Sequence, residues 1–199
     1  MKADEAVELI GKEKEDDQFN KRASVAIAAL AMLLAITGLG GSNATKETFN
    51  NNVLASNYWS FFQAKNLRQA NLNLAIDEIE LAWIKNPAMT DDAKAALQKK
   101  IEDYRKTIAR YESEPSTGEG KKELAAKARE HEHKRDRALK QDPYFDYAMA
   151  LLQIAIVLIS VAMLARQHWL ALAGGGLGMI GGLLMLNGFY LVVNVPFLG

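Results

Sequence analysis

Residues 23–41 read ASVAIAALAMLLAITGLGG and contain no ionisable side chain. At about 1.5 Å per residue, a helix of this length covers roughly the 30 Å hydrocarbon core of a bilayer. We therefore predict a first transmembrane helix at residues 23–41, preceded by a charged tail at residues 1–22. A cleaved signal peptide is the alternative, which the acidic tail and the lack of a separate small-x-small cleavage site disfavour.

Two further apolar stretches follow near the C-terminal end. Asp142 can cap free backbone N–H groups, and Pro143 suits the first position of a helix because no N–H partner is needed there. We predict a second transmembrane helix at residues 143–165 and a third at residues 169–193. Only three polar residues, 166–168, join them, so a tight antiparallel hairpin is expected.

The third predicted span is rich in glycine. Gly174, Gly178 and Gly182 follow one another at steps of four. Small residues at this spacing let two helix backbones approach closely in lipid. These glycines are candidates for helix packing, and the spacing fits a partner helix from the same chain as well as one from another subunit.

Between the first two spans, residues 42–141 are predicted to form a long helical, coiled-coil-like extramembrane segment. Its clearest internal break is Asn86-Pro87, after which Thr90 can cap a new helix whose first turn is acidic. The apolar residues of this new helix recur at steps of four and three, as in a coiled-coil seam. They are Leu97, Ile101, Tyr104, Ile108 and Tyr111.

The preceding predicted helix, roughly residues 48–85, carries two apolar stripes. One stripe consists of Leu72, Ile76, Ile79 and Trp83, and the other of Leu67, Leu74 and Leu81. Two stripes indicate contact from two sides, which is more than a simple hairpin supplies. We therefore predict self-association. The last part of the segment, residues 121–141, has few apolar residues and is expected to be a charged, largely solvated connector.

The net charge, the absence of cysteine and the positions of the basic residues restrict the partners and the orientation of the chain. The 24 basic and 24 acidic residues cancel, so no overall field favours nucleic acid or an acidic substrate, and the absence of cysteine excludes thiolate metal sites and cysteine nucleophiles. The basic residues that favour a cytoplasmic N-terminus and short loop are Lys2, Lys12, Lys14, Lys21, Arg22 and Arg166. Six more lie within residues 127–140, but long segments translocate largely regardless of charge. The large helical segment is therefore predicted to be periplasmic.

The most distinctive stretch is NYWSFFQAKNLRQ, residues 57–69. Its candidate interaction residues are Trp59, Phe62, Gln63, Lys65 and Arg68. Interleaved rings and cations could bind a phosphate or an anionic lipid headgroup. The alternative, which we favour, is a packing cluster in which the Lys and Arg stems cover apolar rings while the charged ends stay in water.

Other polar motifs give weaker signals. Residues 130–133 read EHEH, but side chains two apart on a helix point about 200° from each other, so His131 and His133 cannot share one metal ion. Gln153 and Asn187, inside the second and third spans, are possible intramembrane polar contacts, either with each other or with a neighbouring subunit. We identify no catalytic, metal or cofactor-binding residues and no small-molecule substrate.

The order of these features resembles a known family. A first span ending in LAITGLGG (residues 34–41), the stretch WSFFQAKNLR (residues 59–68), a charged helical middle and paired spans beginning near residue 142 resemble bacterial membrane proteins grouped as domain of unknown function family 4337. The resemblance covers nearly the whole chain after residue 20. The resemblance supports this topology and implies no assigned activity, cofactor or catalytic residue. We expect a multi-pass protein of the bacterial inner membrane.

Three functions are consistent with this anatomy. The first is a non-enzymatic, homo-oligomeric membrane scaffold built from associating helices. The second is an oligomeric channel or pore lined by Gln153 or Asn187, although the spans lack the continuous polar stripe that a water-filled pathway would need. The third and weakest is a lipid-binding protein that uses Trp59, Lys65 and Arg68.

Overall fold

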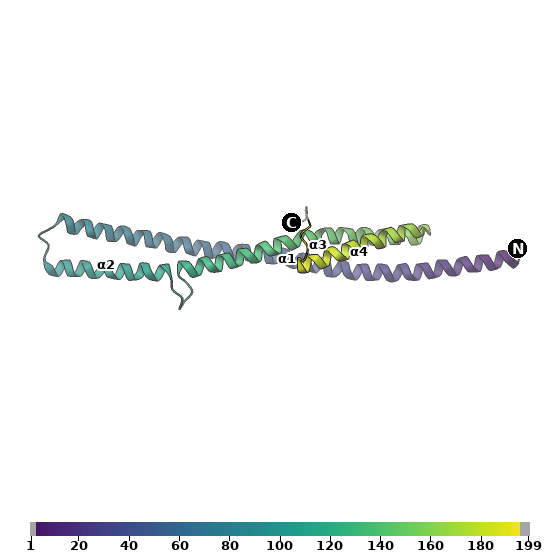
Figure 1. The fold of residues 1–199 in the computed structure, drawn as a ribbon, viewed down its shortest axis with the longest axis horizontal. Helices are drawn as coiled ribbons and strands as arrows, with labels where there is room; N and C mark the ends of the chain where they lie inside the picture. Colours follow the sequence, from purple (N-terminus) through teal and green to yellow (C-terminus); the bar gives the residue numbers. More distant parts are fainter. Residues whose placement is uncertain (1–2, 196–199) are drawn as a thin grey trace. The chain divides into compact units, whose positions relative to one another are not determined.

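The computed structural model describes the backbone of residues 3–195 and the side chains of residues 14–195, so that Lys2 and Lys12 of the basic tail lie outside the described side chains. Within residues 3–195 all regular secondary structure is helical, as predicted (Figure 1). The helices are α1 (Ala3–Lys85), α2 (Asp91–Glu112), α3 (Lys121–Ala165) and α4 (His168–Tyr190).

The chain forms two compact units, which divide α1 and α3 between them. The first contains the chain up to Thr48 and from Asp136 onward, and the second contains Phe49–Arg135. Three helices, α1, α3 and α4, contain segments long and apolar enough to cross a membrane. All three apolar segments belong to the first unit.

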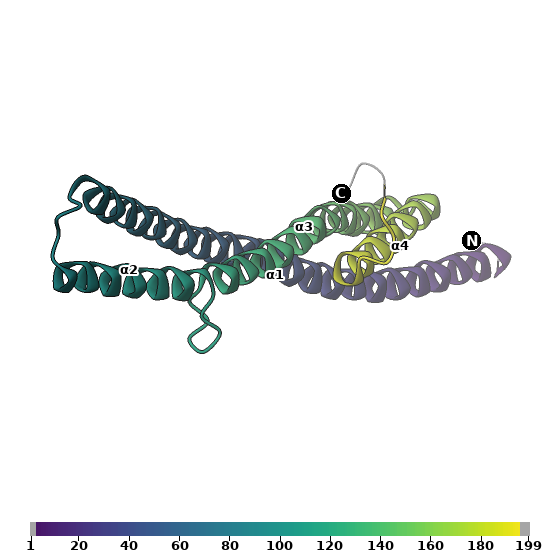
Figure 2. The same cartoon turned by 60° about the vertical axis from the view of Figure 1, so that its left-hand side comes forward.

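The first unit is a bundle of three helices with alternating directions. Gly174 of α4 lies against Ile159 of α3, whereas Gly188 lies against Phe145, so α3 and α4 run antiparallel (Figure 2). Gly178 lies against Leu30 of α1, so α4 contacts both neighbours. The turn between α3 and α4 is tight because Arg166 adopts a left-handed conformation, with φ of 51°.

One face of α4 carries the glycines that pack most closely. Its buried residues are Gly174, Gly178, Gly181, Met185 and Gly188, at steps of four and three. At Gly182, an added Cβ would be 3.9 Å from the nearest Leu33 carbon, an ordinary contact. A step of four turns the helix by 400°, so the two successive steps from Gly174 to Gly182 drift around its surface. Gly181, rather than Gly182, therefore continues the face that packs against α3.

The aromatic ring of Phe145 fills the space that glycines leave on both neighbouring helices. A Cβ placed on Gly40 of α1 or on Gly188 of α4 would come within 3 Å of this ring. Phe145 is buried and meets the ring of Phe189 edge to face, with centroids 4.9 Å apart. The glycines at the end of the first apolar stretch therefore have a packing role, making room for a large side chain.

The predicted helix start at Asp142 and Pro143 is wrong, since α3 runs from Lys121 through Pro143 to Ala165. A proline inside a helix removes one hydrogen bond and costs several kcal/mol in isolation. Here residues on both sides of Pro143 are buried, including Ala138 and Tyr144. Packing of one continuous helix therefore outweighs the local start signal. The Asp142 carboxylate instead accepts a hydrogen bond of 3.0 Å from the Thr45 hydroxyl.

Two other boundaries differ from those expected. Residues 3–22 of the predicted charged tail, the first span and the helix at residues 48–85 are all parts of the single helix α1. The third span was expected to reach residue 193, but α4 ends at Tyr190. Leu191 caps it in a left-handed conformation, with φ of 50°, and its N–H donates to the carbonyl of Asn187.

In the second unit, α2 lies antiparallel to the last part of α1 (Figures 1 and 2). Gln69 of α1 bonds to the Ile108 carbonyl, and Glu80 pairs with Arg105, so the contacts run in opposite directions along the two helices. The predicted cap is confirmed, because the Thr90 side chain accepts a hydrogen bond from the Ala93 N–H. The predicted seam of α2 is turned inward, with Ile101 only 6% exposed.

The two apolar stripes of α1 have different environments. The inner stripe, Leu72, Ile76, Ile79 and Trp83, is buried or half-buried. The outer stripe, Leu67, Leu74 and Leu81, is exposed on the described surface. The first part of α3 is less solvated than predicted, because Leu124 and Ala128 are buried.

Candidate interaction site

The aromatic stretch of α1 lies against the first turns of α3 within the second unit. The Trp59 indole N–H donates to the Glu132 carboxylate at 2.9 Å, and its ring meets Phe62 edge to face. The Tyr58 ring stacks on His131, with centroids 5.5 Å apart. These two contacts join residues more than 70 positions apart in the sequence. In one, the aromatic side chain donates a hydrogen bond to a carboxylate, and in the other, two rings stack.

The cation of this stretch, Lys65, is engaged within the chain. Its side chain is 14% exposed, and its Nζ lies 3.9 Å from the Glu119 carboxylate and 5.4 Å from the centre of the Tyr111 ring. Gln63 and Arg68 are exposed. A headgroup would therefore have to displace an ion pair at Lys65, whereas Arg68 is open to solvent. This geometry favours the packing interpretation of the stretch.

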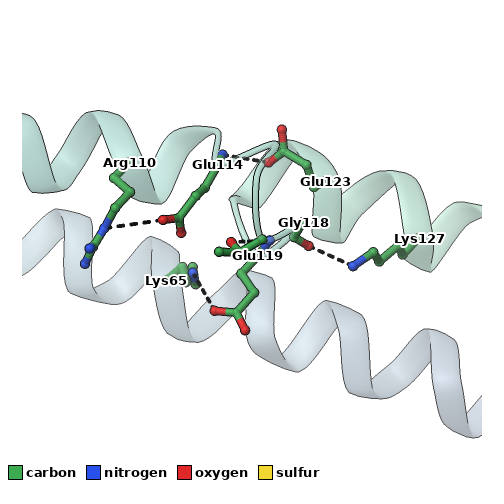
Figure 3. A network of polar contacts seen from close by, with 8 residues as sticks. Lys65, Arg110, Glu114, Gly118, Glu119, Glu123 and Lys127 are labelled. Carbon is green, nitrogen blue, oxygen red and sulfur yellow. Dashed lines mark hydrogen bonds and ion pairs between the residues drawn. The ribbon is translucent and has the colours of Figure 1, made fainter.

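A polar network connects α1, α2 and α3 around the loop at residues 113–120 (Figure 3). The Glu112 carboxylate is 3.0 Å from Lys121 Nζ and accepts a longer bond from the Gln69 amide. The Lys121 ammonium, followed by the Gln69 amide, holds the pKa of Glu112 below its usual value. Lys121 also bonds to Asn66 and lies over the Phe62 ring. One lysine therefore joins α3 to two other helices.

The Glu123 carboxylate closes the loop from the other side. It accepts hydrogen bonds from the Ser113 hydroxyl at 2.6 Å and from the Glu114 backbone N–H at 3.1 Å (Figure 3). These two bonds, that from Ser113 first, lower the pKa of Glu123 from 4.5. Gly118 takes a positive φ of 66° in the same loop, and its carbonyl accepts from Lys127.

We expect the loop to loosen in acid through Glu123. The folded-state pKa lies below 4.5, so the stabilisation is fully present above pH 4.5 and is lost as the pH falls through the folded-state pKa. Hydrogen exchange should show the protection factor of the Glu114 amide falling on acidification. In Glu123→Gln, protection should be lower at neutral pH and independent of pH. An equal acid response in the wild type and this variant would contradict the assignment.

Side chains of the EHEH motif, residues 130–133, also make contacts within the chain. The Nδ1 atom of His131 is 2.8 Å from the Asn51 amide oxygen, and Glu130 pairs with Lys134 at 2.6 Å. Among the described side chains, no group of three or more His, Asp or Glu residues is arranged to hold a metal ion. Glu130, His131 and Glu132 therefore make contacts between or along helices, whereas His133 is exposed.

The two polar residues of the predicted spans do not meet each other. The Asn187 side chain bonds to both the N–H and the carbonyl of Val193, at 2.9 and 2.7 Å, and so holds the segment after α4. The Tyr144 hydroxyl donates to the same carbonyl and accepts from the Val195 N–H. Gln153 is exposed on α3, and its amide has no hydrogen-bond partner among residues 14–195.

The most connected residues of the site were not singled out from the sequence. Glu112, Lys121 and Glu123 each join segments through two or more polar contacts. The one available signal was the turn composition of residues 114–120, which predicts a loop and therefore brings the ends of α2 and α3 together. The choice of partners depends on tertiary contacts with α1.

The structure defines a class of protein: between residues 3 and 195 the chain is all-helical, and three of its helices are long and apolar enough to cross a membrane. The domain of unknown function DUF4337 matches residues 19–191, and the chain belongs to this family. The resemblance inferred from the motifs is thereby confirmed. No curated protein and no solved structure matches the chain.

Proposed function

We propose that this chain is a non-enzymatic, homo-oligomeric integral membrane protein that acts as a helical scaffold. Three spans would anchor it, and the second unit would stand outside the bilayer as an assembly surface. The observation that carries the proposal is the outer stripe of α1, which presents leucines on the side away from α2.

The outer stripe is more apolar than a solvated helix face requires. Leu67, Leu74 and Leu81 are 64%, 62% and 53% exposed, and Ile84 beside them is 75% exposed. Single exposed apolar residues are common, but a contiguous row is typical of an interaction surface. Membrane anchoring does not account for this row, because it lies in the charged part of the chain after the first apolar stretch.

The spacing of the row favours a second copy as its partner. Together with Ala70 and Asp77, the outer stripe and Ile84 form steps of three and four, the a and d positions of a coiled coil. In a parallel pair, each leucine layer would meet its own copy. Glu80 and Lys85 flank the seam five residues apart, the spacing of oppositely charged pairs between parallel helices, although Glu80 also pairs with Arg105 of its own chain. Asp77 would weaken the seam while restricting its register.

The proposed location is the bacterial inner membrane, with the N-terminus and the 166–168 loop in the cytoplasm and the second unit in the periplasm. One observation supports placing the N-terminus and the 166–168 loop on the same side of the membrane. Arg166 pairs with Asp16 at 3.0 Å, and His168 stacks on Phe19. Labelling of a Gln98→Cys variant by a membrane-impermeant thiol reagent in intact cells tests the sidedness, since the chain has no other cysteine.

The scaffold proposal is tested by the mass of the purified chain in detergent, measured by light scattering. We expect an oligomer for the wild type. Leu74→Glu should shift it toward the monomer, because a buried leucine contributes about 1.5–3 kcal/mol and two copies lose one each. The dissociation constant should therefore rise by at least about 100-fold.

The matched control is Gln98→Glu, which places the same side chain on an exposed position of α2. This variant should keep the mass of the wild type. Both variants should retain the helical circular dichroism spectrum, because the Leu74 side chain is mostly exposed in the single chain. A monomeric wild type, or an oligomer that Leu74→Glu leaves intact, would refute the leucine interface.

A further inference from the structure

Gln153 combines two properties that do not fit a single copy in a membrane. Its side chain is exposed, and its amide has no partner among the described residues. It lies nine residues after Tyr144 and twelve before Ala165, roughly 14 and 18 Å along the helix. If α3 crosses the bilayer, the amide is therefore near the middle of the hydrocarbon, beyond the reach of water.

An amide in that position favours a hydrogen-bonded partner. Polar groups in hydrocarbon cost several kcal/mol when unsatisfied, and they commonly bond across helices. Asn187, the other amide of the spans, is already bonded to Val193. Any hydrogen-bond partner of Gln153 other than its own helix would therefore come from outside residues 14–195.

The surface around Gln153 is shaped for a close helix contact. Ala150, Gln153, Val157, Ser160 and Leu164 recur at steps of three and four and form what we call the α3 ridge. Ala150 and Val157, on either side of the amide, are exposed and small or β-branched. The Ser160 hydroxyl donates to the Ile156 carbonyl of its own helix and needs no further partner. Short side chains beside the amide allow two backbones to come near each other.

We propose that the α3 ridge binds the same ridge of a second copy, with the two Gln153 amides hydrogen-bonded to each other. An amide offers both donors and an acceptor, so it is complementary to itself. Copies inserted in one membrane share an orientation, and residues near a twofold axis normal to the membrane meet their own counterparts. A lipid tail provides no hydrogen-bonding group. This inference rests on the proposed function in taking the chain to cross the membrane and self-associate.

Cysteine crosslinking in native membranes tests the contact, because the wild-type chain has no cysteine. Ala150→Cys and Val157→Cys should each form disulfide-linked dimers on mild oxidation. Leu158→Cys is the control, since Leu158 lies about 140° around the helix from Gln153 and against Gly174 of α4 within the same chain. It should form far fewer dimers than either ridge variant.

The role of the amide is tested in detergent with two substitutions at one position. Gln153→Leu should raise the dissociation constant of the oligomer by roughly three- to thirty-fold, the range of a hydrogen bond between membrane helices. Gln153→Asn keeps an amide and should preserve more of the affinity. Circular dichroism should be unchanged in both, because the side chain is exposed.

The outcomes separate this inference from the proposed function. An oligomer with ridge crosslinking no higher than that of Leu158→Cys would overturn the ridge contact and leave the leucine interface standing. Ridge crosslinks together with an affinity that Gln153→Leu does not change would overturn the amide pairing. A wild-type chain that is monomeric in detergent, together with no crosslinked dimers of Ala150→Cys or Val157→Cys, would overturn both proposals.

Discussion

Gly174→Leu is expected to separate α4 from α3 and to destabilise the first unit by more than about 3 kcal/mol, at or above the upper end of overpacking costs. Even a Cβ at Gly174 would lie 2.8 Å from Ile159 Cγ1 and 2.9 Å from the Ala155 carbonyl oxygen. The second of these atoms belongs to the backbone of α3, so it cannot move away by changing a rotamer. The two helices themselves must shift.

The matched control for this substitution lies two residues away. A Cβ on Gly176 would meet nothing within 4 Å, and Gly176 is exposed. Gly176→Leu should therefore leave the stability of the first unit nearly unchanged, whereas Gly174→Ala should give an intermediate loss of about 1–3 kcal/mol. The measurement is loss of helical circular dichroism on heating or denaturation in a mild detergent. Equal stability of Gly174→Leu and Gly176→Leu would show that the close contact is not formed.

This contrast also shows what the sequence could provide and where it stopped. The glycine content predicted a close helix contact, and the spacing identified Gly174 and Gly178, which do lie against neighbouring helices. The third glycine of the packed face depends on the helical period of about 3.6 residues, not on a repeat of four. The closer contact is therefore made by Gly181 and not by Gly182. Which helix each glycine would meet was not encoded in the spacing at all.

Local sequence signals predicted the structure correctly where no tertiary contact opposed them. Thr90 caps α2 as its position predicts, and the seam of α2 is turned inward because its period matches that of a helix. At Pro143 the local signal failed, since packing on both sides of the proline keeps α3 continuous. A start signal is a preference of about 1 kcal/mol, which tertiary contacts can exceed.

The polar network of the second unit was outside the reach of sequence reasoning. Lys121 meets Asn66 and Glu112, partners that lie 55 and 9 positions away. Such pairs form once α1, α2 and α3 are placed side by side, and many other pairings of the 48 charged residues would be equally compatible with their spacing. The network therefore follows from the packing of the helices.

The packing of the second unit gives the other large effect. Ile101→Asp is expected to unfold the α1 and α2 hairpin while leaving the first unit helical. Ile101 is 6% exposed on the inward seam of α2, and Ile76 on the inner stripe of α1 is equally buried. Loss of a buried isoleucine costs about 2–5 kcal/mol, and an unpaired carboxylate in its place adds a desolvation cost. The sum is comparable to the whole stability of a small domain.

Hydrogen exchange of the full chain in detergent measures this effect region by region. Amides of residues 69–83 and 97–108 should lose protection in Ile101→Asp, while those of residues 148–160 keep it. Gln98→Asp places the same carboxylate at an exposed position of α2 and should behave like the wild type. Ile101→Asn removes the same apolar side chain without introducing a charge. Its loss of protection should be smaller, because burying an amide costs less free energy than burying a carboxylate. Retained protection of residues 69–83 in Ile101→Asp would mean that the inward seam does not hold the hairpin together.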